Sequence, residues 1–490
     1  MTDVLLIVPS FSFAAMNTAG NGRGAGGYYL YYPPLGLCSI GACLKQNGIS
    51  VRITDCYIER LGDSGILKIV DVEKPKLIGI TTTTPTLPVV NRLIRTLKEH
   101  REKSGDAFKI VVGGAHISCD PEILPELGAD FGIVGDGEAG MVSLALNIAE
   151  GKGELSIGDG RWETGDGRRE MIAGLVTIQD SRVVVNPPAV VESLGEVPFP
   201  DRTLVKENRY FNPYFPARTT TLLSARGCPF TCAFCCRSEA MGAYRPRPIE
   251  EFLEEASQVD RAGYGFVSLI DETFTYDRAR AAAIADGLLK RNIRFRWSAQ
   301  TRAELVDTEI IRLMKKAGCI NVSFGVESGN SRIRSELDKP ISDAHFVDAF
   351  RICREAGVTT NAFVMIGNPD ETEEDINKSI DFVIGLQPDY AAFNIATLFP
   401  GTKFYRHAIE NGAIDRTIWG RYMRGEEPLP ALSAHFSRDA LSAFLQKGYS
   451  RFYLRPAYIM KKVWQMRSPR QLAYLARIAR TVIAEYAFSF

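Results

Sequence analysis

Hydrophobic and polar positions alternate between two patterns over the first 150 residues. Short apolar runs rich in β-branched residues predict strands, and longer runs with apolar residues three or four positions apart predict helices. The expected strands cover residues 4–10, 51–56, 76–83, 109–114 and 131–135, and the helices between them cover residues 35–48, 88–101 and 139–151. This alternation predicts an α/β fold with a doubly wound parallel sheet, which binds ligands at the carboxyl ends of its strands.

A second series of strand–helix repeats follows in residues 219–405. The expected strands are residues 220–226, 266–272, 295–301, 321–327, 361–367 and 390–396, and the expected helices are residues 249–263, 278–292, 308–318, 342–357 and 372–385. Six such units predict a partial (β/α)6 barrel, because a closed barrel needs eight. Its chemistry is expected at the carboxyl ends of the strands.

Two further segments complete the expected organisation. Residues 151–218 form a polar connector, with a hairpin expected around residues 179–181. Residues 406–490 are expected to be helical, and residues 451–490 carry eight Lys and Arg against a single Glu. A basic amphipathic helix suits an anionic membrane surface or an acidic substrate. The alternative is a packed cap with a solvated basic face.

The composition is that of an ordinary globular protein. The 490 residues are 45% hydrophobic, and 58 acidic residues balance 58 basic ones. Zero net charge argues against a nucleic-acid partner, for which a basic footprint is expected. The apolar residues 4–16 follow Asp3 and contain Pro9, with no preceding positive charge, so they predict a buried strand rather than a signal peptide. No apolar run is long enough to span a bilayer, and we expect a cytoplasmic location.

Three closely spaced cysteines are the strongest chemical signal. Cys228, Cys232 and Cys235 follow C-x3-C-x2-C spacing. Three thiolates so close can hold an iron–sulfur cluster and leave its fourth iron without a protein ligand. No second cysteine pair follows, as a zinc site would need, and a disulfide would leave an odd thiol. We interpret the adjacent Cys236 as a non-ligand, although a shifted ligand register and a purely structural set of thiols remain alternatives.

With Phe234 directly before the third cysteine, this loop resembles the cluster loop of the radical S-adenosylmethionine (SAM) superfamily. The resemblance implies a [4Fe-4S] cluster whose open iron binds the amino and carboxylate groups of SAM. It implies reductive cleavage of SAM to methionine and a 5'-deoxyadenosyl radical, which takes a hydrogen atom from the substrate. It also implies a reductant protein such as flavodoxin or ferredoxin.

Polar residues at the later strand ends of the barrel suit the rest of SAM. The resemblance assigns them, in chain order, as Asp271 and Glu272 near the amino group, Arg302 at the carboxylate, Glu327 with Ser328 at the ribose, and Gly367 beside the adenine. An arginine is well suited to a carboxylate because its guanidinium is a planar fork of donors. The alternative for each acid is a helix cap or a surface ion pair.

The strand-end loops of the first domain are rich in glycine and threonine, at residues 20–27, 81–84, 113–116 and 135–138. A flavodoxin-like or nucleotide-binding domain fits them too, but no G-x-G-x-x-G follows the first strand. Together with residues 33–36 they resemble the cobalamin-binding domain of B12-dependent radical SAM enzymes. The resemblance implies cobalamin contacts from Thr82, Thr83, Gly113, Gly114, His116, Gly135, Gly137 and Glu138.

One feature of other cobalamin domains is missing. The D-x-H-x-x-G motif that supplies a histidine to cobalt is absent. The most similar segment is Asp343-x-His345 in the later domain, which lacks the glycine. The resemblance therefore implies a cobalamin whose own base is displaced and whose cobalt has no protein histidine. For His116 we favour a role near the nucleotide tail, and a packing or turn role is the alternative.

The combined resemblance predicts methylation of an unactivated carbon through methylcobalamin. Radical cyclisation, ring contraction or oxidation without methyl transfer is the alternative with the same cofactors. A methylthiotransferase would need a second cluster, for which Cys38, Cys43, Cys56 and Cys119 are poorly placed. A cobalamin or redox sensor would leave the cysteine triad idle. We expect a small or lipid-like substrate, no nucleic acid, and possible membrane contact through the basic tail.

Overall fold

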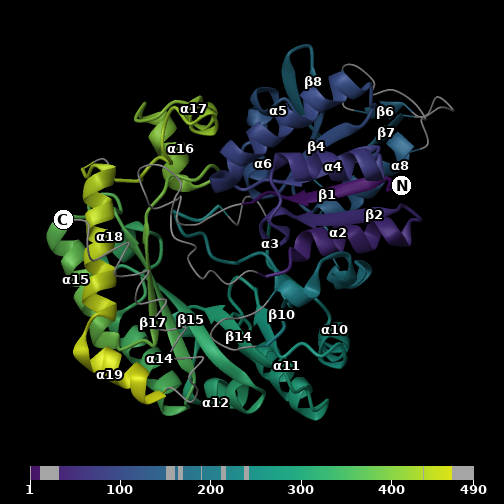
Figure 1. Ribbon diagram of the computed structural model, residues 1–490. Helices are drawn as coiled ribbons and strands as arrows, with labels where there is room; N and C mark the ends of the chain where they lie inside the picture. The colour runs from purple at the N-terminus through teal and green to yellow at the C-terminus, as the bar shows by residue number, and fades with distance from the viewer. Residues whose placement is uncertain are drawn as a thin grey trace.

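The computed structural model describes residues 2–10, 32–149, 161–163, 169–188, 190–191, 193–210, 217–236, 242–433 and 435–465. Two mainly parallel sheets dominate these residues, one in each of two domains (Figure 1). The Gly-rich residues 20–27 and residues 466–490 of the basic tail lie outside the described residues.

The first domain is the expected doubly wound α/β fold. Its parallel strands are β1 (Val4–Val8), β2 (Val51–Asp55), β3 (Leu77–Thr81), β4 (Lys109–Gly113) and β5 (Phe131–Ile133). They lie in the order β2-β1-β3-β4-β5, so the strand order reverses between β1 and β3. Ligands bind outside the carboxyl ends at such a switch point, in flavodoxin-like folds included.

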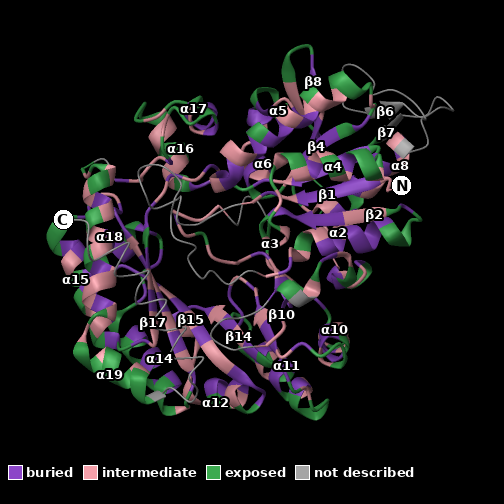
Figure 2. Cartoon of the chain, viewed as in Figure 1, coloured by how far each residue is buried: buried purple, intermediate pink, exposed green. Residues whose placement is uncertain are grey.

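Helices cover both faces of this sheet. They are α2 (Leu35–Gln46), α3 (Cys56–Glu59), α4 (Asp63–Glu73), α5 (Leu87–Ser104), α6 (Ala115–Cys119), α7 (Leu124–Leu127) and α8 (Gly137–Ala149). The sequence pattern missed α4, whose only fully buried side chains are Ile66 and Val70. The middle strands are buried on both sides, as a sheet between two helical layers requires (Figure 2).

The expected hairpin is present and extends this sheet. β8 (Leu175–Gln179) pairs antiparallel with β5, and β9 (Arg182–Val185) pairs antiparallel with β8. Asp180 and Ser181 connect them with φ of 46° and 62°, the left-handed conformation that a tight hairpin turn needs at both central positions. The connector thus contributes two strands to the first domain. A separate pair, β6 (Arg161–Glu163) and β7 (Arg169–Met171), lies nearby.

The second domain is the expected partial barrel. Six parallel strands follow one another in chain order: β10 (Thr219–Leu222), β13 (Phe266–Leu269), β14 (Arg296–Thr301), β15 (Cys319–Glu327), β16 (Thr359–Ile366) and β17 (Tyr390–Ile395). The helices outside them are α10 (Ile249–Arg261), α11 (Arg278–Lys290), α12 (Thr308–Lys316), α13 (Ser331–Glu336), α14 (Asp343–Glu355) and α15 (Glu373–Leu386). Between β10 and β13, β11 (Ala225–Arg226) and β12 (Arg245–Pro246) form a short antiparallel pair.

The chain after the barrel divides between the two domains. Helices α16 (Lys403–Glu410) and α17 (Ile418–Arg424) return to the first domain, where Trp419 joins the core beneath α5 (Figure 1). Helix α18 (Arg438–Tyr453) packs instead beside β17, and α19 (Pro456–Gln465) follows it. This return of the chain was not expected from the sequence.

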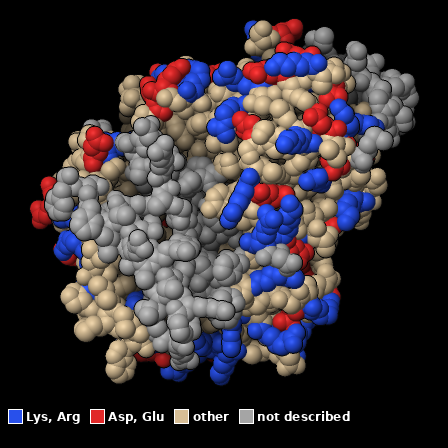
Figure 3. Space-filling view, viewed as in Figure 1, with Lys and Arg blue, Asp and Glu red and all other residues tan. Residues whose placement is uncertain are grey.

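The exterior of the first domain mixes charges of both signs. Lys and Arg alternate with Asp and Glu over the upper right of the view in Figure 3, without a patch of one sign there. Among the helices that the structure describes, none is both long and apolar enough to cross a membrane.

Candidate active site where the two sheet edges meet

The cysteine loop leaves the barrel directly after β11. Gly227 has φ of 79°, and a Cβ there would lie 2.2 Å from the backbone oxygen of Ala243, so only glycine fits this sharp turn. The loop is held from the other side where the amide of Ala233 donates to the backbone oxygen of Leu337 at 3.0 Å. Within it, the amide of Cys235 donates to the oxygen of Cys232 at 3.1 Å.

The thiols of this loop differ from most others in the chain. Cys228, Cys232 and Cys235 are thiols outside any disulfide and are partly exposed. The buried cysteines have thiols whose pKa burial raises well above the ordinary value, and they are Cys38, Cys43, Cys56, Cys319 and Cys353. Reactive or metal-binding thiols need access and nearby positive charge, so the loop thiols are the better donors.

The sulfurs of the three loop cysteines do not lie close enough together to bind one metal ion directly. In the part of the chain that the structure describes, only Asp71, His100 and Asp106 bring three ligand atoms within 4.8 Å of one another. The three loop sulfurs are therefore spaced more widely than the ligands of one ion. Phe234 is half-buried within the same loop.

Arg302 lies against the cysteine loop. Its guanidinium stacks 3.9 Å from the ring centre of Phe230, and its Nη1 donates to Cys232 Sγ at 3.5 Å. Its Nε donates to Glu304 at 2.6 Å. Burial raises the pKa of Cys232, and the positive charges of Lys339 and Arg302 act in the opposite direction. The expected contact of Arg302 with the SAM carboxylate stays a prediction, but the structure places this side chain beside the cluster ligands.

Asp271 anchors the start of the loop. Its carboxylate accepts from the amide of Ser224 at 2.7 Å and from its hydroxyl at 2.5 Å. Complete burial raises the pKa of Asp271 to about 6. Thr273, two residues on, lies 3.7 Å from Cys228 Sγ through its Oγ1, and Glu272 between them is half-buried. The segment is therefore adjacent to the cluster ligands, while an amino-group contact stays a prediction.

Glu327 has a strained backbone at the end of β15. Its φ is 61°, and the pairing of β15 with β16 shifts register between Gly325 and Glu327. A non-glycine residue in this conformation persists only where its surroundings hold it, and such strain concentrates at functional sites. Lys339 holds the side chain, since its Nζ donates to Glu327 Oε1 at 2.7 Å. Lys339 was not expected from the sequence.

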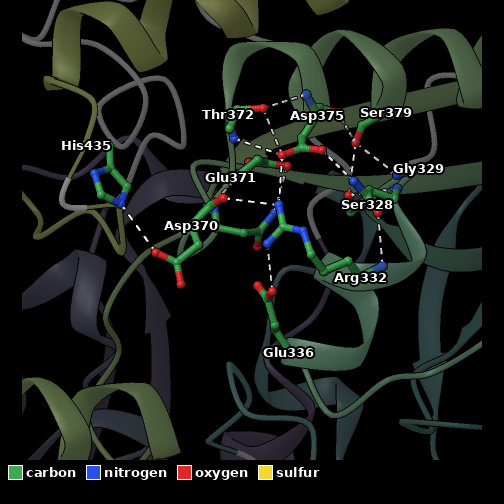
Figure 4. A network of polar contacts seen from close by, with 12 residues as sticks. Ser328, Gly329, Arg332, Glu336, Asp370, Glu371, Thr372, Asp375, Ser379 and His435 are labelled. Atoms are coloured by element: carbon green, nitrogen blue, oxygen red, sulfur yellow. Dashed lines mark hydrogen bonds and ion pairs between the residues drawn. The ribbon is translucent and has the colours of Figure 1, made fainter.

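Ser328 belongs to a network that ties the ends of β15 and β16 together (Figure 4). Its hydroxyl lies 3.0 Å from that of Ser379, which also accepts from the amide of Gly329. Arg332 bridges Asp375 and Glu336 at 2.9 Å and 2.7 Å. Ser328 is completely buried within this network, and its expected contact with the SAM ribose stays a prediction.

The loop after β16 is organised by a buried acid. Gly367 has φ of 84°, and its amide and that of Asn368 donate to Glu371 Oε2 at 2.7 Å and 3.0 Å. Burial raises the pKa of Glu371 to about 7. A carboxyl group thus fixes the turn at which Gly367 was expected to approach the adenine.

In the first domain, the ends of β3 and β4 form one connected edge. The amide of Thr82 donates to the oxygen of Gly113 at 2.6 Å, and Thr83 is exposed. Gly114 has φ of 105°, and a Cβ there would lie 2.8 Å from the oxygen of Thr82. Only glycine therefore fits where the loops after β3 and β4 pack against each other, and the expected cobalamin contacts of these loops stay a prediction.

His116 is buried behind this edge. Its Nδ1 lies 2.9 Å from Thr84 Oγ1, and its ring meets Trp419 edge to face at 5.5 Å between centres. Burial lowers the pKa of His116 to about 3, so the ring is neutral. Its Nε2 and the Nε1 of Trp419 are buried without a hydrogen-bond partner among the described residues. The side chain packs within the domain, and a contact with the nucleotide tail stays a prediction.

The loop after β5 reaches the barrel. Gly135 is exposed, with φ of 75°, and Gly137 begins α8. Asp136 and Glu138 both accept hydrogen bonds from Arg226, at 2.9 Å and 2.5 Å. Because Arg226 lies two residues before Cys228, the carboxyl edges of the two sheets meet at the cysteine loop. The sequence pattern contained no sign of this pairing.

Two family models match this chain. The radical SAM superfamily model matches residues 222–383, and the B12 binding domain model matches residues 25–145. An uncharacterized methyltransferase of Pyrococcus horikoshii is 29% identical over 466 residues, 94% of this chain and 95% of the relative. The anaerobic magnesium-protoporphyrin IX monomethyl ester cyclase of Rubrivivax gelatinosus is 26% identical over 92% of this chain and 84% of the relative.

A solved structure shares the whole architecture. The cobalamin-dependent SAM radical enzyme OxsB, with aqua-cobalamin and SAM bound, aligns with a TM-score of 0.71 at 15% identity, over 99% of this chain and 72% of OxsB. The fold and the cysteine loop define the class of radical SAM enzymes. The chain belongs to the branch that carries a B12 domain, the cobalamin-dependent radical SAM enzymes. Its cofactors are a [4Fe-4S] cluster, SAM and cobalamin.

Proposed function

We propose that this enzyme methylates an unactivated carbon of its substrate. The observation that carries the proposal is the meeting of the two carboxyl edges at the cysteine loop, through Arg226 and Glu138. When bound there, the cluster and SAM supply hydrogen-atom abstraction and cobalamin supplies methyl transfer, which is the combination that an unreactive carbon requires. Similarity to a methyltransferase along almost the whole chain supports the methyl step.

The residues of this chain bind and orient rather than react. Cys228, Cys232 and Cys235 would hold the cluster, and Arg302 keeps a positive charge beside it. The strand-end loops of the barrel would hold SAM, and their buried supports keep them rigid. Preorganised supports of this kind place reacting groups without further ordering cost.

Radical cyclisation or oxidation without methyl transfer is a second candidate. Similarity to the magnesium-protoporphyrin cyclase over 92% of this chain favours it. A methylthiotransferase is disfavoured, because Cys38, Cys43 and Cys56 are buried thiols whose pKa burial raises.

The products of SAM separate these reactions. The enzyme would be prepared without oxygen, with cobalamin supplied, and its cofactors identified by ultraviolet-visible and electron paramagnetic resonance (EPR) spectra. Reduced holoenzyme would then receive SAM with a labelled methyl group. A methylase should form labelled methylcobalamin and S-adenosylhomocysteine. A cyclase should form methionine and 5'-deoxyadenosine without S-adenosylhomocysteine or methylcobalamin, and that result would overturn the methylation proposal.

We also propose a small or lipid-like substrate, a flavodoxin or ferredoxin as reductant, and a cytoplasmic location. Contact with a membrane surface is supported by the outer face of α19, where Ile459, Met460, Val463 and Trp464 are 46%, 62%, 52% and 92% exposed. Exposed apolar side chains with an aromatic among them are typical of interfacial helices. Co-sedimentation with anionic vesicles tests this contact, and failure to sediment would refute it.

A further inference from the structure

Two arginines lie side by side at the base of the cysteine loop. β11 and β12 pair over only two residue pairs, and Arg226 is directly opposite Arg245. A two-stranded ladder of this kind is marginal by itself, and like charges facing each other weaken it further. The closure of the loop therefore depends on contacts from elsewhere in the molecule.

The first domain supplies the compensating charge. Asp136 accepts from Arg226 Nη1 at 2.9 Å through Oδ1, and from Arg245 Nη1 at 2.5 Å through Oδ2. Arg226 also donates to both oxygens of Glu138, at 2.5 Å and 3.3 Å. The side chains of all four residues are between 6% and 13% exposed. Two positive and two negative groups thus neutralise each other away from water.

Each acid also accepts a hydrogen bond from a residue outside the barrel. Asp136 accepts from the amide of Val191 at 3.1 Å, and Glu138 accepts from the hydroxyl of Ser39 on α2 at 2.8 Å. Burial acts to raise the pKa of Asp136, but the hydrogen bond from Arg245 and the charge of Arg226 outweigh it and hold that pKa below its ordinary value. The carboxylate is consequently charged at neutral pH.

The connection to the cluster ligands is short. Cys228 is two positions after Arg226 in the chain, so their Cα atoms can be at most about 7 Å apart. Between them Gly227 makes the tight turn against Ala243, which leaves the backbone little conformational freedom. A displacement of the Arg226 side chain would therefore be transmitted to Cys228.

We propose that Asp136 and Glu138 are positioning residues, which fix the base of the cysteine loop against the cobalamin domain. They would thereby set the separation between the cluster and cobalamin. The expected role of Glu138 as a direct cobalamin contact is then replaced by a role through Arg226. The proposal rests on the two cofactors and not on whether a methyl group is transferred.

The test uses the anaerobic holoenzyme with both cofactors. The reduced cluster and cob(II)alamin each carry unpaired electrons, so pulsed EPR can report their separation through relaxation of the cobalt signal. Hydrogen exchange of peptides from β11 and β12 reports the closure of the loop. The variants are Asp136→Asn, Arg245→Gln and the double variant. The matched control is Arg278→Gln, whose pairs with Asp307 and Glu309 are exposed on the barrel surface.

Both single variants should retain iron and cobalamin. In both single variants, we expect hydrogen exchange at β11 and β12 to be at least tenfold faster than in the wild type. The spin–spin coupling between the cluster and cobalt should cover a broader range. The double variant should differ little from either single variant in both measurements. Arg278→Gln should match the wild type. Should Asp136→Asn fail to fold, Arg245→Lys, which keeps the charge, is expected to give an intermediate exchange rate.

Two results would overturn the proposal. One is wild-type hydrogen exchange and wild-type spin coupling in both variants, which would show that the ion pairs do not hold the base of the cysteine loop in place. The other is loss of cobalamin with wild-type exchange at β11 and β12, which would make the acids contacts of cobalamin.

Discussion

Residues of the same type differ in chemical role in this protein because their surroundings differ. The thiols of Cys228, Cys232 and Cys235 are partly exposed, and Arg302 lies beside Cys232, whereas Cys38 and Cys319 are buried among apolar side chains. The same contrast applies to carboxyl groups, because exposed acids form surface ion pairs and buried acids support strand-end loops. Burial and neighbouring charge therefore decide which of several identical residues can take part in chemistry.

Replacing any one of Cys228, Cys232 or Cys235 by Ala should abolish cluster retention and SAM cleavage, because three thiolates hold the cluster. Iron content, the EPR signal and 5'-deoxyadenosine formation measure this. Cys236→Ala is the matched control, being a thiol in the same loop, and should retain all three. Cluster loss in Cys236→Ala with retention in a triad variant would show that the ligand register is shifted.

Glu371→Gln should change how stability depends on pH. Burial raises the pKa of Glu371 to about 7 from an ordinary value of 4.5. The folded state therefore holds this proton more tightly than the unfolded state, and the resulting stability is present below pH 4.5 and lost as pH rises through 7. The loss is on the order of 1.4 kcal/mol per pH unit within that window.

Urea unfolding at several pH values from 5 to 8 checks this prediction. The wild type should lose stability more steeply than Glu371→Gln as pH rises, because glutamine has no proton to lose. Asp271, whose pKa burial raises to about 6, contributes in the same direction in both proteins and so cancels in the comparison. Parallel pH profiles would show that Glu371 does not titrate in this range.

At the scale of elements, the segment after the barrel determines how the first domain is closed. Helix α17 places Ile418, Trp419 and Met423 in the core beneath α5. The hydroxyl of Tyr422 donates to the backbone oxygen of Pro85 at 3.2 Å, in the loop after β3. Both contacts join residues more than 300 positions apart, so the cobalamin domain is complete only when the C-terminal part of the chain has folded.

Trp419→Ala should destabilise the first domain by about 3–5 kcal/mol, the usual cost of removing a large aromatic side chain from a core. Trp419 is completely buried, whereas Trp464 is 92% exposed, so Trp464→Ala provides a control of identical chemistry. Thermal unfolding, monitored by hydrogen exchange in peptides of β3 and β4, measures the difference in stability between the two variants. Equal effects of the two substitutions would contradict the packing described for α17.

At the scale of the whole molecule, two parallel sheets present their carboxyl edges to each other. The loop after β5 contacts the base of the cysteine loop, and the backbone oxygen of Cys236 lies 4.0 Å from Cys119 Sγ on α6. Parallel sheets bind ligands at that edge as a general rule, so we expect cobalamin at one edge and SAM at the other. The arrangement of the two domains, rather than one loop, would then bring cobalamin and SAM together.

Cobalamin should protect the first of these edges. Ligand at 100 times its dissociation constant stabilises the binding state by about 2.7 kcal/mol. Hydrogen exchange should slow in peptides that contain Thr82 and Gly114, and should be unchanged in α12 on the barrel exterior. Uniform or absent protection would contradict the placement of cobalamin at the ends of β3 and β4.

The sequence by itself determined the local features of this protein. The period of apolar residues predicted both sheets, and the spacing of Cys228, Cys232 and Cys235 predicted the cluster, because both depend on neighbours within a few positions. Helix α4 was missed since only Ile66 and Val70 of its side chains are fully buried. Only the tertiary structure decided the pairing of Asp136 with Arg226, 90 residues away, and the return of α17. Such contacts depend on how distant segments pack, and no local pattern encodes them.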